Sequence, residues 1–242
     1  MTQKMSALIV GAGDATGGAI AKRFAQEGML TCAVRRTADK LQPLLDEIQK
    51  TGGQGYGFAC DARKEDEVVK LVEDIERDIA PIDVLVFNIG ANVPCSILDE
   101  TARKYFKIWE MACFSAFLVG REVARRMVVR KRGTIIFTGA TAGLRGSANF
   151  AAFAGAKHAL RALAQSMARE LGPSNIHVAH VVIDGAIDTA FIRDNFPDRY
   201  ALKDQDGVLN PDHIADNYWH LYRQPRDAWT QELDLRPWVE HW

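Results

Sequence analysis

Short apolar runs alternate with longer helical segments along almost the whole sequence, and this alternation constrains the fold more than any other feature. Most of the apolar runs lack polar alternation, which is typical of strands buried on both faces of a parallel sheet. The pattern predicts an α/β protein with a doubly wound parallel sheet of about seven strands, covered by helices on both faces. The candidate strands are Ala7–Gly11, Leu30–Val34, Gly55–Ala59, Val84–Asn88, Thr134–Thr138, Ile176–Ile183 and Gln231–Leu235.

Three long helices are predicted from apolar residues that recur at helical spacing. They cover Glu65–Ala80, Thr101–Arg130 and Asn149–Leu171. The apolar stripe of the second helix includes Phe106 and Phe117, and we expect it to face the core.

The composition excludes several classes of protein. Lys and Arg number 30 against 31 Asp and Glu, so no excess of positive charge points to a nucleic acid or an acidic membrane as partner. No apolar stretch approaches the ~20 residues needed to cross a bilayer, and no secretory signal precedes the first strand. The four cysteines are far apart, so neither a disulfide framework nor a zinc site is expected. We therefore expect a cytoplasmic protein that binds a small-molecule substrate.

Two segments near the end of the chain depart from the alternation. Residues 188–210 are rich in charged residues, Phe and Tyr, and both an ordered loop and a mobile lid over a ligand are open interpretations. The tail Glu232–Trp242 carries Trp238 and Trp242, which are expected to pack against the body of the protein or against a neighbouring subunit.

A glycine-rich loop lies between the first strand and a helix. Glycines let the chain turn tightly and let its backbone approach a pyrophosphate, whose charge is stabilised by the N–H groups at the helix start. The alternative is a tight turn without a ligand. Because the loop has the context that this mechanism requires, we expect a single Rossmann-type NAD(P)-binding domain over residues 1–242. The expected pyrophosphate-binding residues are Gly11, Gly13, Ala15, Thr16 and Gly17.

Two arginines follow the second strand, at Arg35 and Arg36, and no acidic residue precedes Asp39. A cofactor with a free ribose 2′-hydroxyl usually meets Asp or Glu at this place, whereas a guanidinium suits a 2′-phosphate. The sequence therefore favours NADP(H) over NAD(H). A solvated basic turn is the alternative.

Further motifs occur in the order found in the short-chain dehydrogenase/reductase family, which the chain resembles along nearly its whole length. Cys60-Asp61-Ala62 resembles the family's turn that contacts adenine, and Asn88-Ile89-Gly90 resembles its segment beside the cofactor. The segment from Asp184 to Thr189 is similar to the one that holds the nicotinamide carboxamide. The resemblance implies cofactor-binding roles for Asp61, Ala62, Asn88, Gly90, Lys157, Gly185, Ile187 and Thr189.

The catalytic positions depart from the family pattern. The family's Tyr-x-x-x-Lys motif corresponds to the segment from Phe153 to Lys157, its serine to Ala140, and its asparagine to Ala112 or a neighbour. A phenyl ring can neither give nor take a proton, and alanine cannot hydrogen-bond a substrate oxygen. Lys157 alone matches, and the resemblance implies that it donates to the nicotinamide ribose hydroxyls. A lysine that reaches from the edge of the apolar stripe to water is the alternative.

The missing proton donor has several candidate replacements. Asp184 stands where the family has proline, beside the expected nicotinamide, and burial favours the protonated form of a carboxyl. We therefore expect Asp184 and Lys157 to form the altered catalytic set, with His158 as a weaker candidate. Other groups near the lost positions also have structural interpretations; they are Thr138, Thr141, Cys113 and Ser115.

Three functions follow as hypotheses. The first is an NADP(H)-dependent oxidoreductase that reduces an activated C=C, C=N or carbonyl group. The second is a catalytically impaired nucleotide-binding protein with a regulatory or partner role; a third, without cofactor or chemistry, requires vestigial motifs. Aromatic residues near the expected site suggest an apolar or aromatic ligand; they are Phe150, Phe191, Phe196 and Tyr200. The resemblance implies a homodimer or homotetramer, and the small residues Ala152, Ala156 and Ala159 would let two copies of the third helix approach closely.

Overall fold

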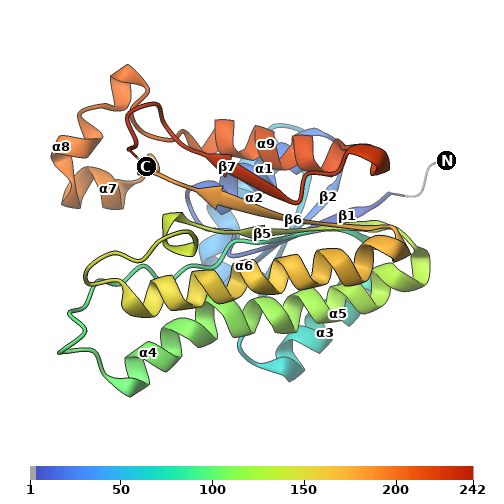
Figure 1. Cartoon of the computed structure of the whole chain (residues 1–242). Coiled ribbons are helices and arrows are strands. Elements are labelled where there is room, and N and C mark those ends of the chain that lie inside the picture. The colour runs from blue at the N-terminus through green and yellow to red at the C-terminus, as the bar shows by residue number, and fades with distance from the viewer. Residues whose placement is uncertain (1–3, 242) are drawn as a thin grey trace.

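A seven-stranded sheet lies at the centre of the computed structural model, which describes residues 4–241 (Figure 1). The strand order is β3-β2-β1-β4-β5-β6-β7, and all neighbouring pairs are parallel. The doubly wound architecture predicted from the sequence is thus confirmed, with small shifts of the strand ends. The strands are β1 (Ser6–Val10), β2 (Leu30–Arg35), β3 (Gln54–Ala59), β4 (Ile82–Phe87), β5 (Gly133–Thr138), β6 (Ile176–Ile183) and β7 (Glu232–Leu235).

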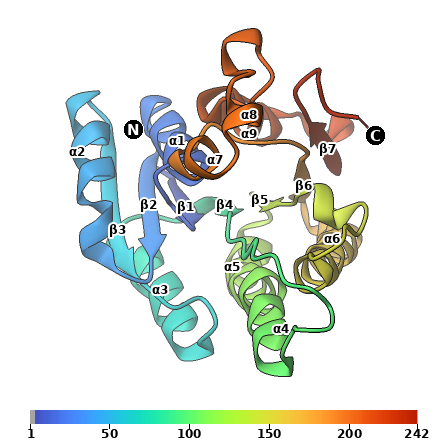
Figure 2. The ribbon, with the colours of Figure 1, turned by 90° about the vertical axis from the view of Figure 1, so that its left-hand side faces the viewer.

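Helices cover both faces of the sheet, as Figure 2 shows in a view along the strands. One face carries α1 (Thr16–Gln26), α2 (Gln42–Lys50) and α9 (Pro211–Arg223). The other carries α3 (Glu65–Asp78), α4 (Ala102–Trp109), α5 (Ser115–Arg130) and α6 (Ala151–Leu171). Two short helices, α7 (Ala190–Asn195) and α8 (Pro197–Tyr200), lie beyond the carboxyl ends of the strands.

Burial on both faces explains why the central strands lack polar alternation. Leu8 packs with Phe137 on the face of α5 and α6, and Ile9 packs with Phe24 on the face of α1 and α9; all four side chains are fully buried. Each such side chain stabilises the fold by ~1.5–3 kcal/mol. The expectation of burial on both faces is wrong for the edge strands β3 and β7, which have only one neighbouring strand and are partly exposed.

The predicted helix over Thr101–Arg130 contains a π-helical turn at Glu110–Phe114, between α4 and α5. A π turn adds a residue and rotates the helix faces before and after it relative to one another. Phe106 and Phe117 are therefore 59% and 36% exposed, so the expectation that they face the core is wrong. Their rings belong instead to a stacked outer row with Trp109 and Phe114.

The small residues of α6 also lie differently from the expectation. Ala152 and Ala156 are buried within the protomer, against Ile108 and Ala112. They are therefore not available for contact with a second copy. Their burial instead brings α6 close to α4 and the π-helical turn.

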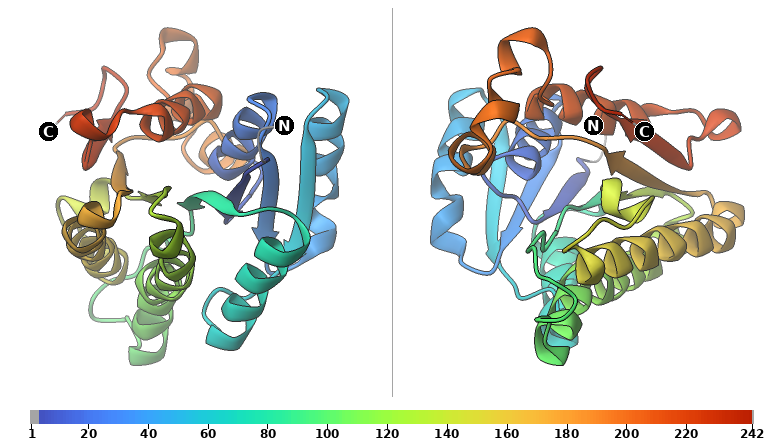
Figure 3. Two further views of the ribbon diagram at one scale, coloured as in Figure 1. Left: turned by 90° about the vertical axis from the view of Figure 1, so that its right-hand side faces the viewer. Right: turned by 60° about the vertical axis from the view of Figure 1, so that its left-hand side comes forward.

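Residues 188–210, which include α7 and α8, lie near one end of α9 in the right panel of Figure 3, and the tail after β7 contacts them. The Trp238 Nε1–H donates to the Gln205 carbonyl at 2.8 Å, so the tail packs on this segment as predicted, although Trp238 is 73% exposed. Trp242 lies outside the described residues. None of the helices between residues 4 and 241 is long and apolar enough to span a bilayer.

Candidate functional site

Two adjoining cavities follow the carboxyl ends of the strands, and both are lined by Asn88, Ile89 and Gly90. The first, of about 310 Å³, is called here the arginine groove. Besides those three residues it is lined mainly by Gly11, Gly13, Arg35, Arg36, Asp61, Ala62, Arg63 and Ser115. The second, of about 750 Å³, is called the phenylalanine cavity. Its further lining includes Thr16, Ala140, Phe150, Phe153, Lys157, Gly185, Ile187, Phe191 and Phe196.

The loop between β1 and α1 packs directly on the end of β4. Gly11 has a φ of +89°, and a Cβ there would lie 2.7 Å from the carbonyl oxygen of Asn88. The Asn88 side-chain amide donates to the Gly11 carbonyl at 3.2 Å and fixes this approach. No side chain caps the start of α1, and the buried Thr16 hydroxyl has no hydrogen-bond partner in the described structure. Free N–H groups and an unpaired hydroxyl at a helix start suit an anion such as a pyrophosphate.

Gly17 supports a test of this loop. It lies in α1 and lines neither cavity, but a Cβ there would overlap the Gly11 carbonyl oxygen and come within 3.0 Å of the Ala12 Cα. We expect Gly17→Ala to displace the loop and to lower the affinity for a dinucleotide at least tenfold, with a loss of thermal stability. Gly172→Ala, at the end of α6, is the control because a Cβ at Gly172 has open space and this residue lines neither cavity. Calorimetric titration with NADPH measures both; equal affinity in the two variants would contradict the proposed role of this packing.

Three arginines line the arginine groove, and two of them are paired. Arg35 donates to the Asp14 carboxylate at 2.9 Å and to the Lys40 carbonyl at 3.2 Å. Arg63 forms a two-point ion pair with Asp61, with distances of 2.8 and 2.5 Å. Arg36 is exposed, and no carboxylate between residues 4 and 241 pairs with it. The groove therefore has cationic character at the end where the sequence predicts a 2′-phosphate.

Arg63 was not anticipated from the sequence, although it directly follows the Cys60-Asp61-Ala62 motif. Its hydrogen bonds lower the pKa of Asp61 to about 2, so this carboxyl is ionised at neutral pH. Asp61 and Arg63 are each about four-fifths buried. The pair presents a planar guanidinium to the groove, a shape that stacks on aromatic rings.

The three positions that carry polar groups in the resembled family form one apolar cluster here. Ala112 of the π-helical turn and Phe153 of α6 are buried together with Ala156, and Ala140 packs against them. The cluster lines the phenylalanine cavity through Ala140 and Phe153. Ala140 and Phe153 therefore give the cavity an apolar wall at this place.

Lys157 lies beside this cluster and is 3% exposed. Its Nζ donates to the carbonyls of Thr138 at 2.7 Å and Ile89 at 3.2 Å, and lies 5.8 Å from the centre of the Phe153 ring. The alternative of a lysine that reaches to water is therefore wrong. Burial disfavours the ammonium and lowers the pKa of Lys157 to about 8. The third donor position of the ammonium is the one that a ligand hydroxyl would use.

The lowered pKa of Lys157 predicts a pH dependence of stability. In the unfolded chain this pKa returns to 10.5, so between pH 8 and 10.5 the unfolded chain binds more protons than the folded one. The contribution of Lys157 to the free energy of unfolding then rises with pH by about 1.4 kcal/mol per unit. We expect the stability of the wild type relative to Lys157→Met to increase with this slope in urea unfolding. Parallel curves for the two proteins would contradict it.

Asp184 is fully buried but does not line the phenylalanine cavity. Its Oδ1 accepts from the Thr141 hydroxyl at 2.6 Å and from Arg145 at 3.4 Å, and Arg236 lies 3.7 Å from its Oδ2. The geometry therefore supports a structural ion pair and gives no support to Asp184 as a proton donor.

The weaker donor candidates also have structural partners. The Thr138 and Tyr218 hydroxyls are hydrogen-bonded to each other at 2.7 Å. Ser115 donates to the Met111 carbonyl at 2.6 Å, and His158 Nδ1 lies 2.9 Å from the Ala154 carbonyl. Burial raises the pKa of Cys113 and so disfavours its thiolate.

The remaining predicted cofactor residues are divided between two places. Gly185 and Ile187 line the phenylalanine cavity. Ala15 and Thr189 line a neighbouring cavity of about 690 Å³, between α1 and α7. The Thr189 hydroxyl accepts from the Ile192 N–H at 3.2 Å and caps α7.

Comparison with known proteins now decides the family. Residues 5–199 match the short chain dehydrogenase family. The chain belongs to this family. A short-chain dehydrogenase from Rhodopseudomonas palustris has a solved structure that is 46% identical, with a TM-score of 0.82 over 97% of this chain and 99% of that one. A metagenomic short-chain oxidoreductase solved in complex with NADP is 26% identical, with a TM-score of 0.84 over 98% of each chain. The 3-oxoacyl-[acyl-carrier-protein] reductase MabA of Mycobacterium tuberculosis is 31% identical over 188 residues, 78% of this chain and 71% of the relative.

The chain is thus a member of a family of NAD(P)-dependent oxidoreductases. The residues present fit such a cofactor because the glycine loop admits close backbone approach, and Thr16 has an unpaired hydroxyl. The residues that would hold the cofactor are Gly11, Gly13, Asn88 and Lys157. Family membership alone does not specify the acceptor.

Proposed function

We propose that this short-chain dehydrogenase is an NADP(H)-dependent oxidoreductase that works without a tyrosine phenol. The observation that carries the proposal is the phenylalanine cavity, which continues the arginine groove and contains the buried Lys157 beside a phenyl wall. Bound NADPH would supply a hydride to an electron-poor carbon of an activated C=C, C=N or carbonyl group.

The preference for NADP(H) rests on the arginine groove. Arg36 is unpaired among the described residues, and Arg35 is held by a single exposed carboxylate, Asp14, whose side chain is 90% exposed. Both guanidinium groups can therefore turn to a 2′-phosphate at little cost in other contacts. Asp61, Ala62 and Arg63 would line the adenine end of the same groove.

Lys157 and Phe153 would have different roles in the phenylalanine cavity. The Lys157 ammonium is fixed on two carbonyls and would hold the nicotinamide ribose hydroxyls, so its role is orientation. Phe153 and Ala140 would pack on the acceptor and exclude polar partners from its reacting atom. Phe153 and Ala140 have no acidic proton to donate. The proton that the acceptor needs in addition to the hydride would therefore come from water that enters past the exposed Phe191 and Phe196.

The test is NADPH oxidation with a panel of acceptors: an α,β-unsaturated ketone, a cyclic iminium ion, a quinone and a simple aromatic ketone. We expect turnover with the first three and little with the ketone, because the activated acceptors need less help from a proton donor. Lys157→Met is the control and should lose most of this turnover. Tight NADPH binding without turnover on any acceptor would contradict the proposal.

The apolar cluster favours a second candidate function, a nucleotide-binding protein with a regulatory or partner role. Coordinated replacement of three polar positions by Ala112, Ala140 and Phe153 is what loss of catalysis would leave behind. The acceptor panel separates the two functions, since a regulatory protein should bind NADPH and leave it unoxidised.

We also propose that residues 1–242 form one domain and that residues 188–210 act as its lid. The lid places Phe191 and Phe196 on the cavity, with their ring centres 6.0 Å apart. Assembly into a homodimer or homotetramer is proposed from family membership; in α6, it would use exposed residues such as Ala151 and Gly155 in place of the buried Ala152 and Ala156.

A further inference from the structure

Two arginines stand at the rim of the phenylalanine cavity, and the chain's own tail occupies both. Arg199 of α8 pairs with the Glu240 carboxylate at 2.9 Å, and the Arg145 guanidinium donates to the His241 carbonyl at 3.5 Å. Glu240 and His241 are adjacent, so both guanidinium groups contact the same short stretch of the tail. All four residues line the cavity.

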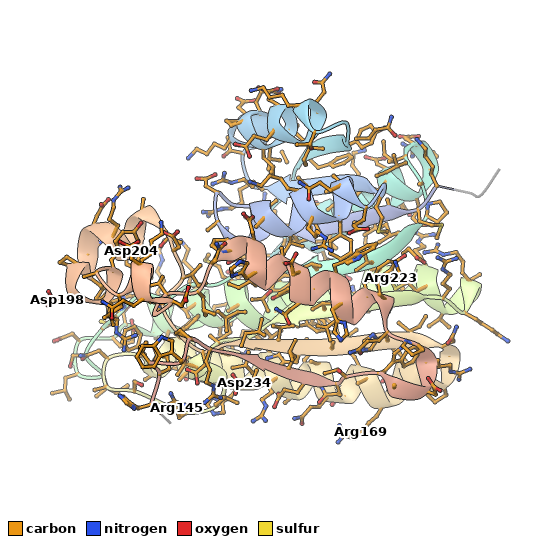
Figure 4. The ribbon with its side chains drawn as sticks, turned by 90° about the horizontal axis from the view of Figure 1, so that it is seen from above. Arg145, Arg169, Asp198, Asp204, Arg223 and Asp234 are labelled. Atoms are coloured by element: carbon orange, nitrogen blue, oxygen red, sulfur yellow. The ribbon has the colours of Figure 1, made fainter. Side chains whose placement is uncertain are left out.

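Figure 4 shows Arg145 at the end of the molecule where Asp198 and Asp204 of the lid lie, whereas Arg169 lies toward the opposite end. Arg145 follows β5, and Arg199 belongs to the lid of residues 188–210. The two arginines therefore stand on different walls of the cavity. Arg145 makes only long contacts, and Glu240 is the partner of Arg199. Arg145 is 40% exposed and shares Asp184 with Arg236 at long range, and Arg199 is 59% exposed.

The charges and the apolar surface of the cavity point to one ligand chemistry. Lys157, Arg145 and Arg199 line it against a single carboxylate, that of Glu240, which leaves an excess of positive charge. Phe191 and Phe196 line the same cavity and are 56% and 47% exposed, so part of their apolar surface lacks cover. A ligand that covers both rings and meets both arginines has an apolar body and an anionic group.

We propose that the acceptor of this short-chain dehydrogenase is a carboxylate with an apolar or aromatic body, bound through Arg145 and Arg199. The Glu240 carboxylate holds the place of the ligand's anionic group in the ligand-free protein. The ligand displaces Glu240 from Arg199, and the tail gives up its ion pair with the lid when the cavity fills. This inference deepens the proposed function, since it names the class of acceptor for the same cavity.

The experiment measures binding of a carboxylate that cannot be reduced. Calorimetric titration compares 4-phenylbutanoate with the neutral 4-phenylbutan-1-ol, at saturating NADP⁺ and without cofactor. We expect the carboxylate to bind at least tenfold more tightly than the alcohol. Loss of a charge-assisted hydrogen bond costs about 10- to 100-fold in affinity, so Arg145→Gln and Arg199→Gln should each weaken the carboxylate by such a factor and leave the alcohol unchanged.

Two further variants make the test specific. Glu240→Gln removes the competing carboxylate and should tighten binding of 4-phenylbutanoate several-fold, a gain that damage to the fold would not produce. Arg169→Gln, at the far end of the molecule, is the matched control and should change nothing. Equal binding of acid and alcohol, or no effect of Glu240→Gln, would overturn the proposal. If the protein binds the acid tightly but oxidises NADPH with none of the acceptors in the panel, the result supports this site and rejects the proposed function.

Discussion

Phe153→Tyr combined with Ala140→Ser is expected to raise kcat/KM for a simple aromatic ketone by about 10²- to 10⁴-fold, because it restores a general acid beside the cavity. Phe153 lines the cavity and lies 5.8 Å from the Lys157 ammonium. That positive charge would favour the ionised phenol and so bring the tyrosine closer to its working range. Steady-state NADPH oxidation with the ketone measures the gain.

The single variants and a shape control make this prediction specific. Groups of a catalytic unit act together, so Phe153→Tyr alone and Ala140→Ser alone should each recover only a small part of the gain. Phe153→Leu keeps the wall apolar and should recover none. If wild type already reduces the ketone as fast as the double variant, the view that the phenyl wall limits the chemistry is wrong.

Arg35→Asp is expected to weaken NADPH binding about 100-fold while NADH binding changes little. The substitution removes one guanidinium that can pair with the 2′-phosphate. It also puts a carboxylate next to Asp14, whose carboxylate accepts a hydrogen bond from Arg35 in the wild type. Calorimetric dissociation constants for both cofactors on both proteins give the result directly.

Asp14→Asn is the matched variant for this prediction. It releases Arg35 from its ion pair without removing the guanidinium, so NADPH should bind at least as tightly as to the wild type. Equal dissociation constants of wild type for NADPH and NADH would sink the phosphate interpretation, and Arg36 would then be a solvated side chain only.

The sequence predicted the sheet and the glycine loop because their signals are local. A strand buried on both faces, such as β4, needs an unbroken apolar run, and the tight approach of Gly11 to Asn88 needs a glycine whatever the rest of the chain does. The family resemblance and the parallel arrangement of the strands followed from several such signals in sequence. The misplacement of Phe106 and Phe117 arose because a π-helical turn leaves no mark in an apolar stripe.

The candidate site depended more on contacts between distant segments. Asp184 was expected to act as an acid, but Thr141, Arg145 and Arg236 surround it, and none of these contacts can be inferred from its neighbours in sequence. The pairing of Arg199 with Glu240 likewise joins residues 41 positions apart. Arg63 was within reach, since it extends a motif already recognised.

Lys157 shows how much a single residue of a motif can predict about a site. Its place in the sequence implied a role toward the ribose, while its burial and its two carbonyl partners came only from the fold. A buried ammonium with one donor position left over is costly to keep without a ligand. That cost supports a role in binding over a role in packing alone.

A crystal structure with bound NADP⁺ tests the central claim most directly, through the atoms that surround the nicotinamide C4. The account predicts the Phe153 ring and Ala140 beside C4, the Lys157 ammonium on the ribose hydroxyls, and a guanidinium from Arg35 or Arg36 on the 2′-phosphate. A tyrosine hydroxyl next to C4, or a nicotinamide ring that lies outside the phenylalanine cavity, would contradict it.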